Sequence, residues 1–189
     1  PVEADLVIGV PDSGLSAAMG YAEESGIQYG EGLVKNRYIG RTFIQPSQAM
    51  RENSVNIKLN VLKNNVKDKR IVMIDDSIVR GTTIRNIVNM LKKAGAKEVH
   101  VRISAPPFLW PCYFGTDIPD RTQLVAVKHT VEEIREKIGA DSLGYLSIEG
   151  LSQIAKDSKL KFCDACFTGN YPFEVPISAD KLAFERSKC

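Results

Sequence analysis

The amino-acid sequence predicts an α/β fold in which helices flank a mainly parallel sheet. Two strand–loop–helix units carry this prediction, one over residues 5–25 and the other over residues 71–95. Each unit begins with an apolar run that suits a parallel strand buried on both faces, and continues through a turn into apolar residues at helical spacing. Since parallel strands end at one edge of a sheet, both turns are expected where open α/β sheets bind ligands.

The unit at 71–95 organises the rest of the chain. Four consecutive apolar residues, 71–74, are followed by Asp75 and Asp76 and then by a short turn that contains glycine. Apolar residues then recur at i, i+3, i+4 and i+7, which predicts a helix with Gly95 as its stop. These apolar residues are Ile84, Ile87, Val88 and Leu91.

The turn of this unit has the residue types of a phosphate site. Gly81 allows a tight turn that exposes backbone N–H groups, and the two threonines after it supply hydroxyl donors and a helix N-cap. The amino end of a helix carries partial positive charge and binds phosphate. Asp75 and Asp76, when ionised, only accept hydrogen bonds, so they suit sugar hydroxyls or hydrated Mg²⁺. A ribose 5-phosphate therefore fits, with its phosphate on residues 79–83. The absence of Gly-Lys-Ser/Thr excludes a Walker P-loop.

The unit at 5–25 places a second loop at the same edge. A strand is predicted at 5–10, a turn at 11–14, and a helix that ends near Ser25 with Gly26 as its stop. Taken alone, this loop could equally be a plain turn before a helix.

A basic segment follows a further predicted strand at 27–34. Residues 35–44 contain three cations, an aromatic side chain and a glycine, and they form no amphipathic pattern. This mixture suits a mobile arm that closes on an anion such as departing pyrophosphate. A solvated surface hairpin is the alternative on composition alone.

Residues 71–83 resemble the PRPP-binding signature of the type I phosphoribosyltransferases. Three motifs in this order, Val-Pro-Asp-Ser-Gly, Lys-Asn-Arg-Tyr-Ile-Gly-Arg-Thr-Phe-Ile-Gln-Pro and Asp-Asp-Ser-Ile-Val-Arg-Gly-Thr-Thr, are similar to those of the glutamine phosphoribosylpyrophosphate amidotransferase family. The middle motif discriminates best, because salvage phosphoribosyltransferases carry a different flexible loop. The resemblance extends from about Val2 to about Pro172 and implies the type I phosphoribosyltransferase fold, with a flexible loop and an irregular C-terminal tail.

The resemblance also implies roles for individual residues. The PRPP-binding residues would be Asp12, Ser13, Gly14, Asp75, Asp76, Ser77, Val79, Arg80, Gly81, Thr82 and Thr83. Ser13, Asp75 and Asp76 would hold Mg²⁺. The catalytic residues of the basic loop would be Lys35, Arg37, Tyr38 and Arg41.

Cysteines form a second pattern. Cys112, Cys163 and Cys166 resemble three ligands of the [4Fe–4S] cluster found in one class of this amidotransferase family, whose fourth ligand would lie outside this chain. If so, the three lie close together in space although about fifty residues separate the first from the others. Zinc, or ordinary free thiols, are the alternatives for the Cys-x-x-Cys pair. Cys189 has no counterpart that the resemblance places.

The remaining elements follow from short patterns. A helix is predicted within 46–63, strands at 98–103 and 124–128, and a final helix at about 148–156. Thr130 and Glu133 form a capping box that begins a helix to about Ile138. His100 and His129 are expected to be structural.

Length and composition set the outer limits. The 189 residues, 43% apolar and 25% charged with net charge +2, suit a globular domain at 1–150 followed by a helix and cysteine-containing tail at 151–189. No nucleic-acid surface, membrane span or signal peptide is evident, so a cytoplasmic location is expected. The start at Pro1, without Met, suggests an excised piece that lacks the family's N-terminal glutaminase domain.

The expected activity is therefore formation of 5-phosphoribosylamine from PRPP and ammonia with release of pyrophosphate, the first committed step of purine synthesis. Glutamine is not expected to serve as nitrogen donor for this chain alone. The resemblance also implies feedback inhibition by purine nucleotides and a homo-oligomer. The alternatives are a salvage transferase for a purine base, which leaves the cysteines unexplained, and a non-catalytic PRPP sensor, which should carry a nucleic-acid-binding element.

Overall fold

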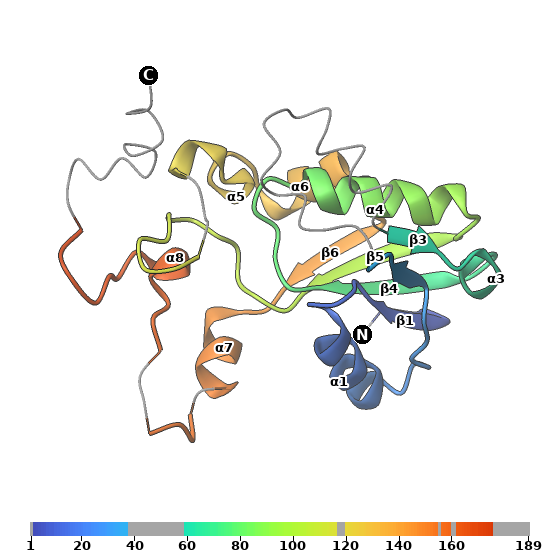
Figure 1. The fold of residues 1–189 in the computed structure, drawn as a ribbon, viewed down its shortest axis with the longest axis horizontal. Helices are drawn as coiled ribbons and strands as arrows, with labels where there is room; N and C mark the ends of the chain where they lie inside the picture. Colours follow the sequence, from blue (N-terminus) through green and yellow to red (C-terminus); the bar gives the residue numbers. More distant parts are fainter. Residues whose placement is uncertain (1, 38–58, 117–119, 155, 160–161, 176–189) are drawn as a thin grey trace.

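The computed structural model describes residues 2–37, 59–116, 120–154, 156–159 and 162–175. Its centre is a four-stranded parallel sheet in the order β1 (Leu6–Gly9), β4 (Arg70–Asp75), β5 (Glu98–Ile103), β6 (Ser142–Tyr145). Figure 1 shows these strands side by side, with their helices above and below. The predicted α/β fold and mainly parallel sheet are confirmed.

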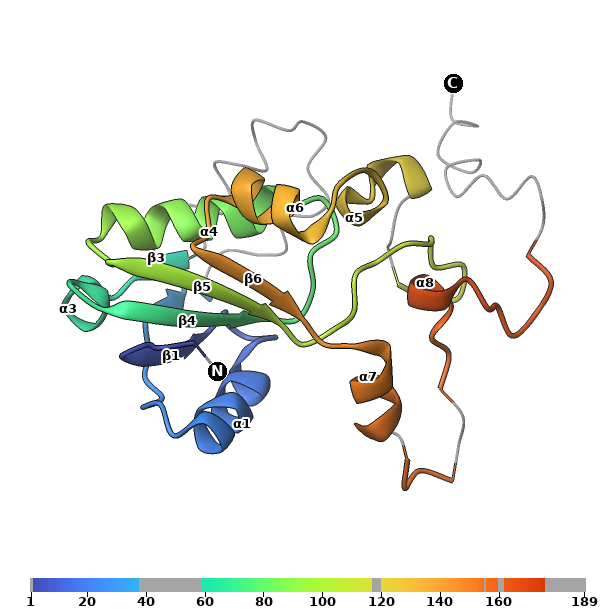
Figure 2. The same ribbon diagram turned by 180° about the vertical axis from the view of Figure 1, so that it is seen from behind.

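Alternate residues along the strands face two different helical layers. Val7, Val72 and Ile74 pack against α1 (Leu15–Ser25) on one face. On the other face, the larger core cluster joins strand residues such as Ile71 and Val101 to α4 (Thr82–Lys93) and α6 (Val131–Ile138). Figures 1 and 2 show α1 on one side of the sheet and α4 with α6 on the other. The apolar residues predicted on the second helix, Ile84, Ile87, Val88 and Leu91, are all buried.

A small antiparallel pair lies beside this sheet. It consists of β2 (Leu33–Lys35) and β3 (Leu59–Val61), and α3 (Lys63–Val66) follows. The predicted strand at 27–34 is therefore shorter than expected, although Tyr29 makes an isolated parallel bridge with Val7. The helix predicted within 46–63 falls mostly outside the described residues.

The predicted strand at 124–128 is wrong. A 3-10 helix, η2 (Arg121–Gln123), and a short helix, α5 (Val125–Lys128), occupy this segment. Leu124 is fully buried in a small cluster with Phe108, so tertiary packing decides the conformation of a run too short for periodicity to assign. Strand β6 was not predicted, because its Ser-Leu-Gly-Tyr sequence lacks a β-branched run and none of its residues is fully buried.

The predicted capping box at the start of α6 is confirmed. The Thr130 hydroxyl accepts a hydrogen bond from the Glu133 N–H at 3.3 Å, and the Glu133 carboxylate accepts one from the Thr130 N–H at 2.7 Å. The predicted strand at 98–103 and the stop of α1 at Gly26, in a left-handed conformation, are also confirmed.

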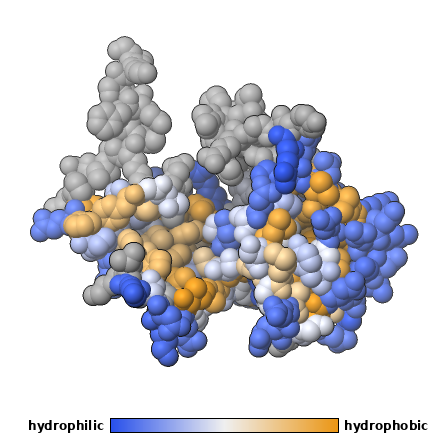
Figure 3. All heavy atoms as spheres, turned by 60° about the horizontal axis from the view of Figure 1, so that its bottom comes forward, coloured by the Kyte–Doolittle hydropathy of each residue, from blue (hydrophilic) through white to orange (hydrophobic). Residues whose placement is uncertain are grey.

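The C-terminal part packs loosely beside the sheet. It contains α7 (Ile148–Ile154) and α8 (Ala165–Thr168). Phe167 stacks on Phe108 at 5.0 Å, and several large apolar side chains stay exposed, among them Ile154 at 75%, Phe162 at 66% and Phe173 at 73%. Figure 3 shows hydrophobic surface on this side of the molecule. Among the described residues, no helix is long and apolar enough to cross a membrane.

Candidate active site

The two predicted loops meet at one edge of the sheet. Strands β1 and β4 run in parallel register, with Gly9 opposite Ile74, so the loops that follow them begin side by side. The Val10 N–H donates to the Ile74 carbonyl at 2.9 Å, and the Gly14 N–H donates back to Val10 at 2.8 Å. Across the same edge, the Ser13 hydroxyl donates to an Asp75 carboxylate oxygen at 3.4 Å. Packing of β1 on β4 therefore brings together two loops that lie about sixty residues apart in sequence.

Asp75 is the buried member of the acidic pair. It is the last residue of β4 and 7% exposed, whereas Asp76 is exposed. Burial, together with the neighbouring charge of Asp76, raises the pKa of Asp75 to about 7. The Asp76 N–H donates to the Asp75 carboxylate at 2.9 Å, which fixes its orientation. From their position at the end of a strand, both acids would be expected to lie outside the core, and this expectation is wrong for Asp75.

The loop after the acids leads directly into a helix N-terminus. Ile78 is 3% exposed and anchors the loop in the core, while Arg80 and Thr83 are exposed. Gly81 has φ +81° and is the N-cap of α4, so a glycine is required there. The predicted threonine N-cap is wrong, because Thr82 and Thr83 are the first helical residues and no side chain caps the helix. Their N–H groups belong to the unsatisfied first turn, which suits an anion.

The basic segment begins beside the first loop. Lys35 ends β2 and forms an ion pair with the Asp12 carboxylate, so it lies in a strand and not in a mobile arm. Arg37 is exposed. Tyr38 and Arg41 lie outside the described residues, as does most of the predicted arm at 35–44.

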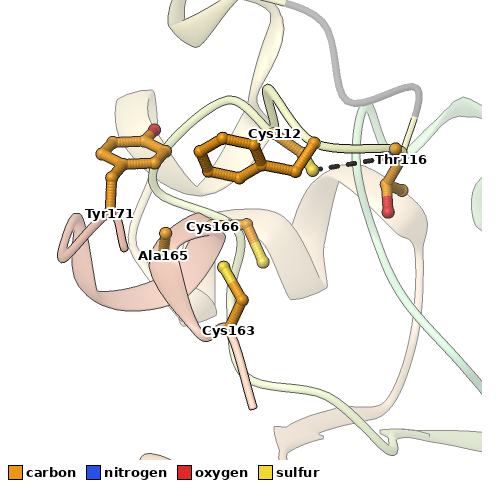
Figure 4. Close-up of a pocket in the computed structure, with 8 residues that line it drawn as sticks. Cys112, Thr116, Cys163, Ala165, Cys166 and Tyr171 are labelled. Carbon is orange, nitrogen blue, oxygen red and sulfur yellow. Dashed lines mark hydrogen bonds between the residues drawn. The ribbon is translucent and has the colours of Figure 1, made fainter. Parts of the chain in front are cut away.

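The three cysteines line one cavity, which confirms their predicted proximity. Its volume is about 220 Å³, and Cys112, Cys163 and Cys166 share it with aromatic residues that include Phe114 and Tyr171. In Figure 4 the thiols of Cys163 and Cys166 project into the same space, while Cys112 lies on the facing loop and accepts a 3.5 Å hydrogen bond from the Thr116 N–H. Within the part of the chain that the structure describes, no three His, Cys, Asp or Glu side chains form a compact metal-binding group.

The thiols at this cavity differ in acidity. Burial, with a smaller contribution from the nearby Cys112 and Cys163 thiols, raises the pKa of Cys166 to about 11. Burial also tends to raise the pKa of Cys112, but hydrogen bonds from the Phe114 and Thr116 N–H groups more than offset this and leave it below its ordinary value. Cys112 is therefore the more easily ionised of the two.

Comparison with known proteins places this site in a family. Residues 2–105, which include both loops and the acidic pair, match the family model of the phosphoribosyl transferase domain. The chain belongs to the phosphoribosyltransferase family. The type I fold expected from the sequence is confirmed by solved structures of the family.

Among phosphoribosyltransferases, the chain is similar to the amidophosphoribosyltransferases. Those of Archaeoglobus fulgidus and Bacillus subtilis are each 58% identical over 178 residues, which cover 93% and 92% of this chain and 39% and 37% of theirs. The solved structure of the B. subtilis glutamine PRPP amidotransferase, complexed with ADP and GMP, is 57% identical with a TM-score of 0.81 and covers 94% of this chain and 40% of its own. The resemblance to the amidotransferase family is confirmed, and this phosphoribosyltransferase chain spans about two fifths of the length of these relatives.

Sequence reasoning missed one group of residues at this site. Gln123 accepts a hydrogen bond from the Arg80 guanidinium at 2.5 Å, and the Val125 N–H donates to the Val79 carbonyl at 2.9 Å. No sequence signal pairs residues 79–80 with 123–125, and the erroneous strand prediction hid the contact. His100, in contrast, bonds Glu98 and Ser142 within the sheet, as expected of a structural residue.

Proposed function

We propose that this chain binds PRPP at the edge formed by residues 10–14 and 75–83 and transfers its phosphoribosyl group to ammonia. The observation that carries the proposal is the contact of Ser13 with Asp75, because it joins the two loops beside the open N-terminus of α4. A helix N-terminus that can bind phosphate, two carboxylates and a hydroxyl then lie at one edge of the sheet. This is the set of groups that a sugar carrying both a phosphate and a pyrophosphate requires.

Each group has a distinct task in this proposal. The N–H groups of residues 81–83 bind the 5-phosphate, with Ser77, Val79 and Arg80 completing the loop. Asp75 and Asp76 accept hydrogen bonds from the ribose hydroxyls. Ser13, Asp75 and Asp76 supply the oxygen ligands that suit Mg²⁺, whose charge would offset that of the pyrophosphate. Asp12 and Gly14 belong to the loop expected at the pyrophosphate.

The chemistry needs positioning more than a protein nucleophile. The bond from C1 to the pyrophosphate oxygen breaks with its electron pair on pyrophosphate, the ammonia lone pair forms the new C1–N bond, and the nitrogen then loses a proton. Lys35 and Arg37, together with Tyr38 and Arg41, would stabilise the departing charge and exclude water. The Lys35–Asp12 ion pair supports this arrangement, because it already holds one cation beside the first loop.

A turnover assay with PRPP and Mg²⁺ tests the proposal. Ammonia is expected to yield phosphoribosylamine and pyrophosphate, whereas purine bases should give no nucleotide. Base-dependent pyrophosphate release would favour a salvage transferase, and PRPP binding without turnover of any acceptor would favour a sensor. Addition of ADP or GMP, the two nucleotides named for the B. subtilis structure, is expected to inhibit. The predicted cytoplasmic location and homo-oligomer stay predictions.

We further propose that Cys112, Cys163 and Cys166 hold three irons of a [4Fe–4S] cluster, with a fourth ligand outside this chain. In such a cluster each thiolate binds a different iron, so the thiols stand farther apart than around one zinc ion. The observation that supports this proposal is that all three cysteines line one cavity. Anaerobic reconstitution followed by electron paramagnetic resonance of the reduced sample tests it. A silent sample that retains stoichiometric zinc would contradict the cluster.

A further inference from the structure

The side-chain amide of Gln123 is held at both of its ends. Its oxygen accepts a hydrogen bond from Arg80 Nη2 at 2.5 Å, and its nitrogen donates to the Asp120 carboxylate at 3.1 Å. Since both polar atoms of the amide are engaged, its orientation is set. The amide therefore lies between the Asp120 carboxylate and the Arg80 guanidinium, which belongs to the loop before α4 (the phosphate loop, residues 77–81).

The segment that carries Gln123 is itself fixed. The Asp120 carboxylate accepts from the Thr122 N–H at 2.8 Å and caps the 3-10 helix. Arg121 donates to the Leu109 carbonyl at 3.1 Å and lies 3.9 Å above the Trp110 ring. Two residues beyond Gln123, the Val125 N–H donates a hydrogen bond to the Val79 carbonyl. Two consecutive residues of the phosphate loop are thus held from a segment more than forty residues away.

We propose that Gln123 is a positioning residue for the site of the 5-phosphate, acting through Arg80. This inference rests on the proposed binding of PRPP at residues 75–83. Val79 and Arg80 directly precede Gly81, so their orientation sets the direction in which the first turn of α4 presents its N–H groups. Without an outside contact, an exposed loop of this kind samples several conformations.

The chemical type of the partner matters as much as its position. An amide oxygen holds the guanidinium of Arg80 without neutralising it, and among the described residues Arg80 forms no ion pair. The full positive charge therefore stays beside the loop, where a phosphate dianion benefits from it. A carboxylate at position 123 could still accept from Arg80, but it would cancel this charge and could not donate to Asp120.

The test compares Gln123→Met and Gln123→Glu with the wild-type chain. Gln123 is exposed, so neither variant should impair folding. Gln123→Met removes both hydrogen bonds and is expected to raise the Kd and KM for PRPP about five-fold, with kcat changed by less than about two-fold. Backbone amides of residues 81–83 should also exchange faster without ligand. Gln123→Glu keeps an acceptor for Arg80 but cancels its charge and loses the hydrogen bond to Asp120, so it should also weaken PRPP binding. Gln153→Met, on α7, is the matched control.

A double-mutant cycle separates action through Arg80 from other causes. In the Arg80→Met background, Gln123→Met should have no further effect on PRPP affinity. A full additional loss in that background, or unchanged affinity in both Gln123 variants, would overturn the inference alone. A wild-type chain that binds no PRPP would overturn the proposed function and the inference with it.

Discussion

Two regions of the molecule are built in different ways. One is the sheet edge at residues 9–14 and 74–83, and the other is the cysteine region at 106–116 and 162–173. The first is backbone packed on backbone: a Cβ at Gly14 would lie 2.3 Å from the Ile74 carbonyl oxygen, and Ile78 is 3% exposed. The second surrounds a cavity with aromatic contacts and one short helix, while Phe173 stays 73% exposed. The core therefore preforms the sheet edge, whereas the order of the cysteine region should depend on what fills its cavity.

The largest expected effect comes from Gly14→Ala. The added methyl group would push the first loop away from the end of β4, because the atoms it meets belong to the backbone. We expect a loss of about 3 kcal/mol in the free energy of unfolding, measured by urea denaturation. Gly20→Ala, in the middle of α1 with open space around it, is the control and should stabilise by about 0.5–1 kcal/mol. A Gly14→Ala variant as stable as the wild type would contradict the tight packing.

Asp75→Asn should separate stability from function. With a pKa of about 7 in the folded chain and 3.8 as the ordinary value, the folded state holds its proton more tightly than the unfolded state does. The contribution of Asp75 to the free energy of unfolding is therefore fully present below about pH 4, and it is lost as the pH rises through about 7. Without Mg²⁺, Asn should therefore stabilise the protein at pH 8 by about 2 kcal/mol while weakening PRPP binding.

The matched variant is Asp76→Asn. Asp76 is exposed, so this change should alter the pH dependence of unfolding only slightly, by removing the charge that helps to raise the pKa of Asp75. It should also weaken PRPP binding. Equal melting temperatures for wild type and Asp75→Asn between pH 5 and pH 8 would show that Asp75 is not the buried titrating group.

A smaller and local effect is expected from Phe167→Ala. The substitution removes the ring that stacks on Phe108 at 5.0 Å, close to the Cys166 carbonyl that accepts from the Leu109 and Trp110 N–H groups at 3.0 Å. Amide exchange at residues 109 and 110 should accelerate about ten-fold, whereas exchange in β4 and α4 should stay unchanged. Uniform acceleration across the sheet would mean that the two regions form one cooperative unit.

The smallest change concerns reactivity and not stability. Because the pKa of Cys112 is lowered and that of Cys166 is raised to about 11, Cys112 should be alkylated by iodoacetamide at least about ten times faster at pH 8. Peptide mass spectrometry after short exposure measures this. A bound cluster should protect both thiols, so the comparison applies to the chain without iron, and preferential labelling of Cys166 would contradict the assigned hydrogen bonds.

The sequence by itself determined the parts of the protein that local patterns encode. The apolar runs at 5–10 and 71–74, the helical spacing from Ile84 to Leu91 and the capping box of Thr130 and Glu133 each act within about a dozen residues. Their elements formed as predicted. The placement of two loops at one edge also followed, because parallel strands share the direction of their ends.

Only the tertiary structure decided what depends on packing between distant segments. Contacts between segments tens of residues apart bury Asp75 and raise its pKa, and they produce a helix at Val125–Lys128 in place of a strand. The same kind of contact forms the weakly patterned β6 and the hydrogen bond between Gln123 and Arg80. A local pattern carries no information about such contacts. Burial then sets the charge of a carboxylate, and packing sets the conformation of short apolar runs, because the free energies involved exceed the small intrinsic preferences of the chain.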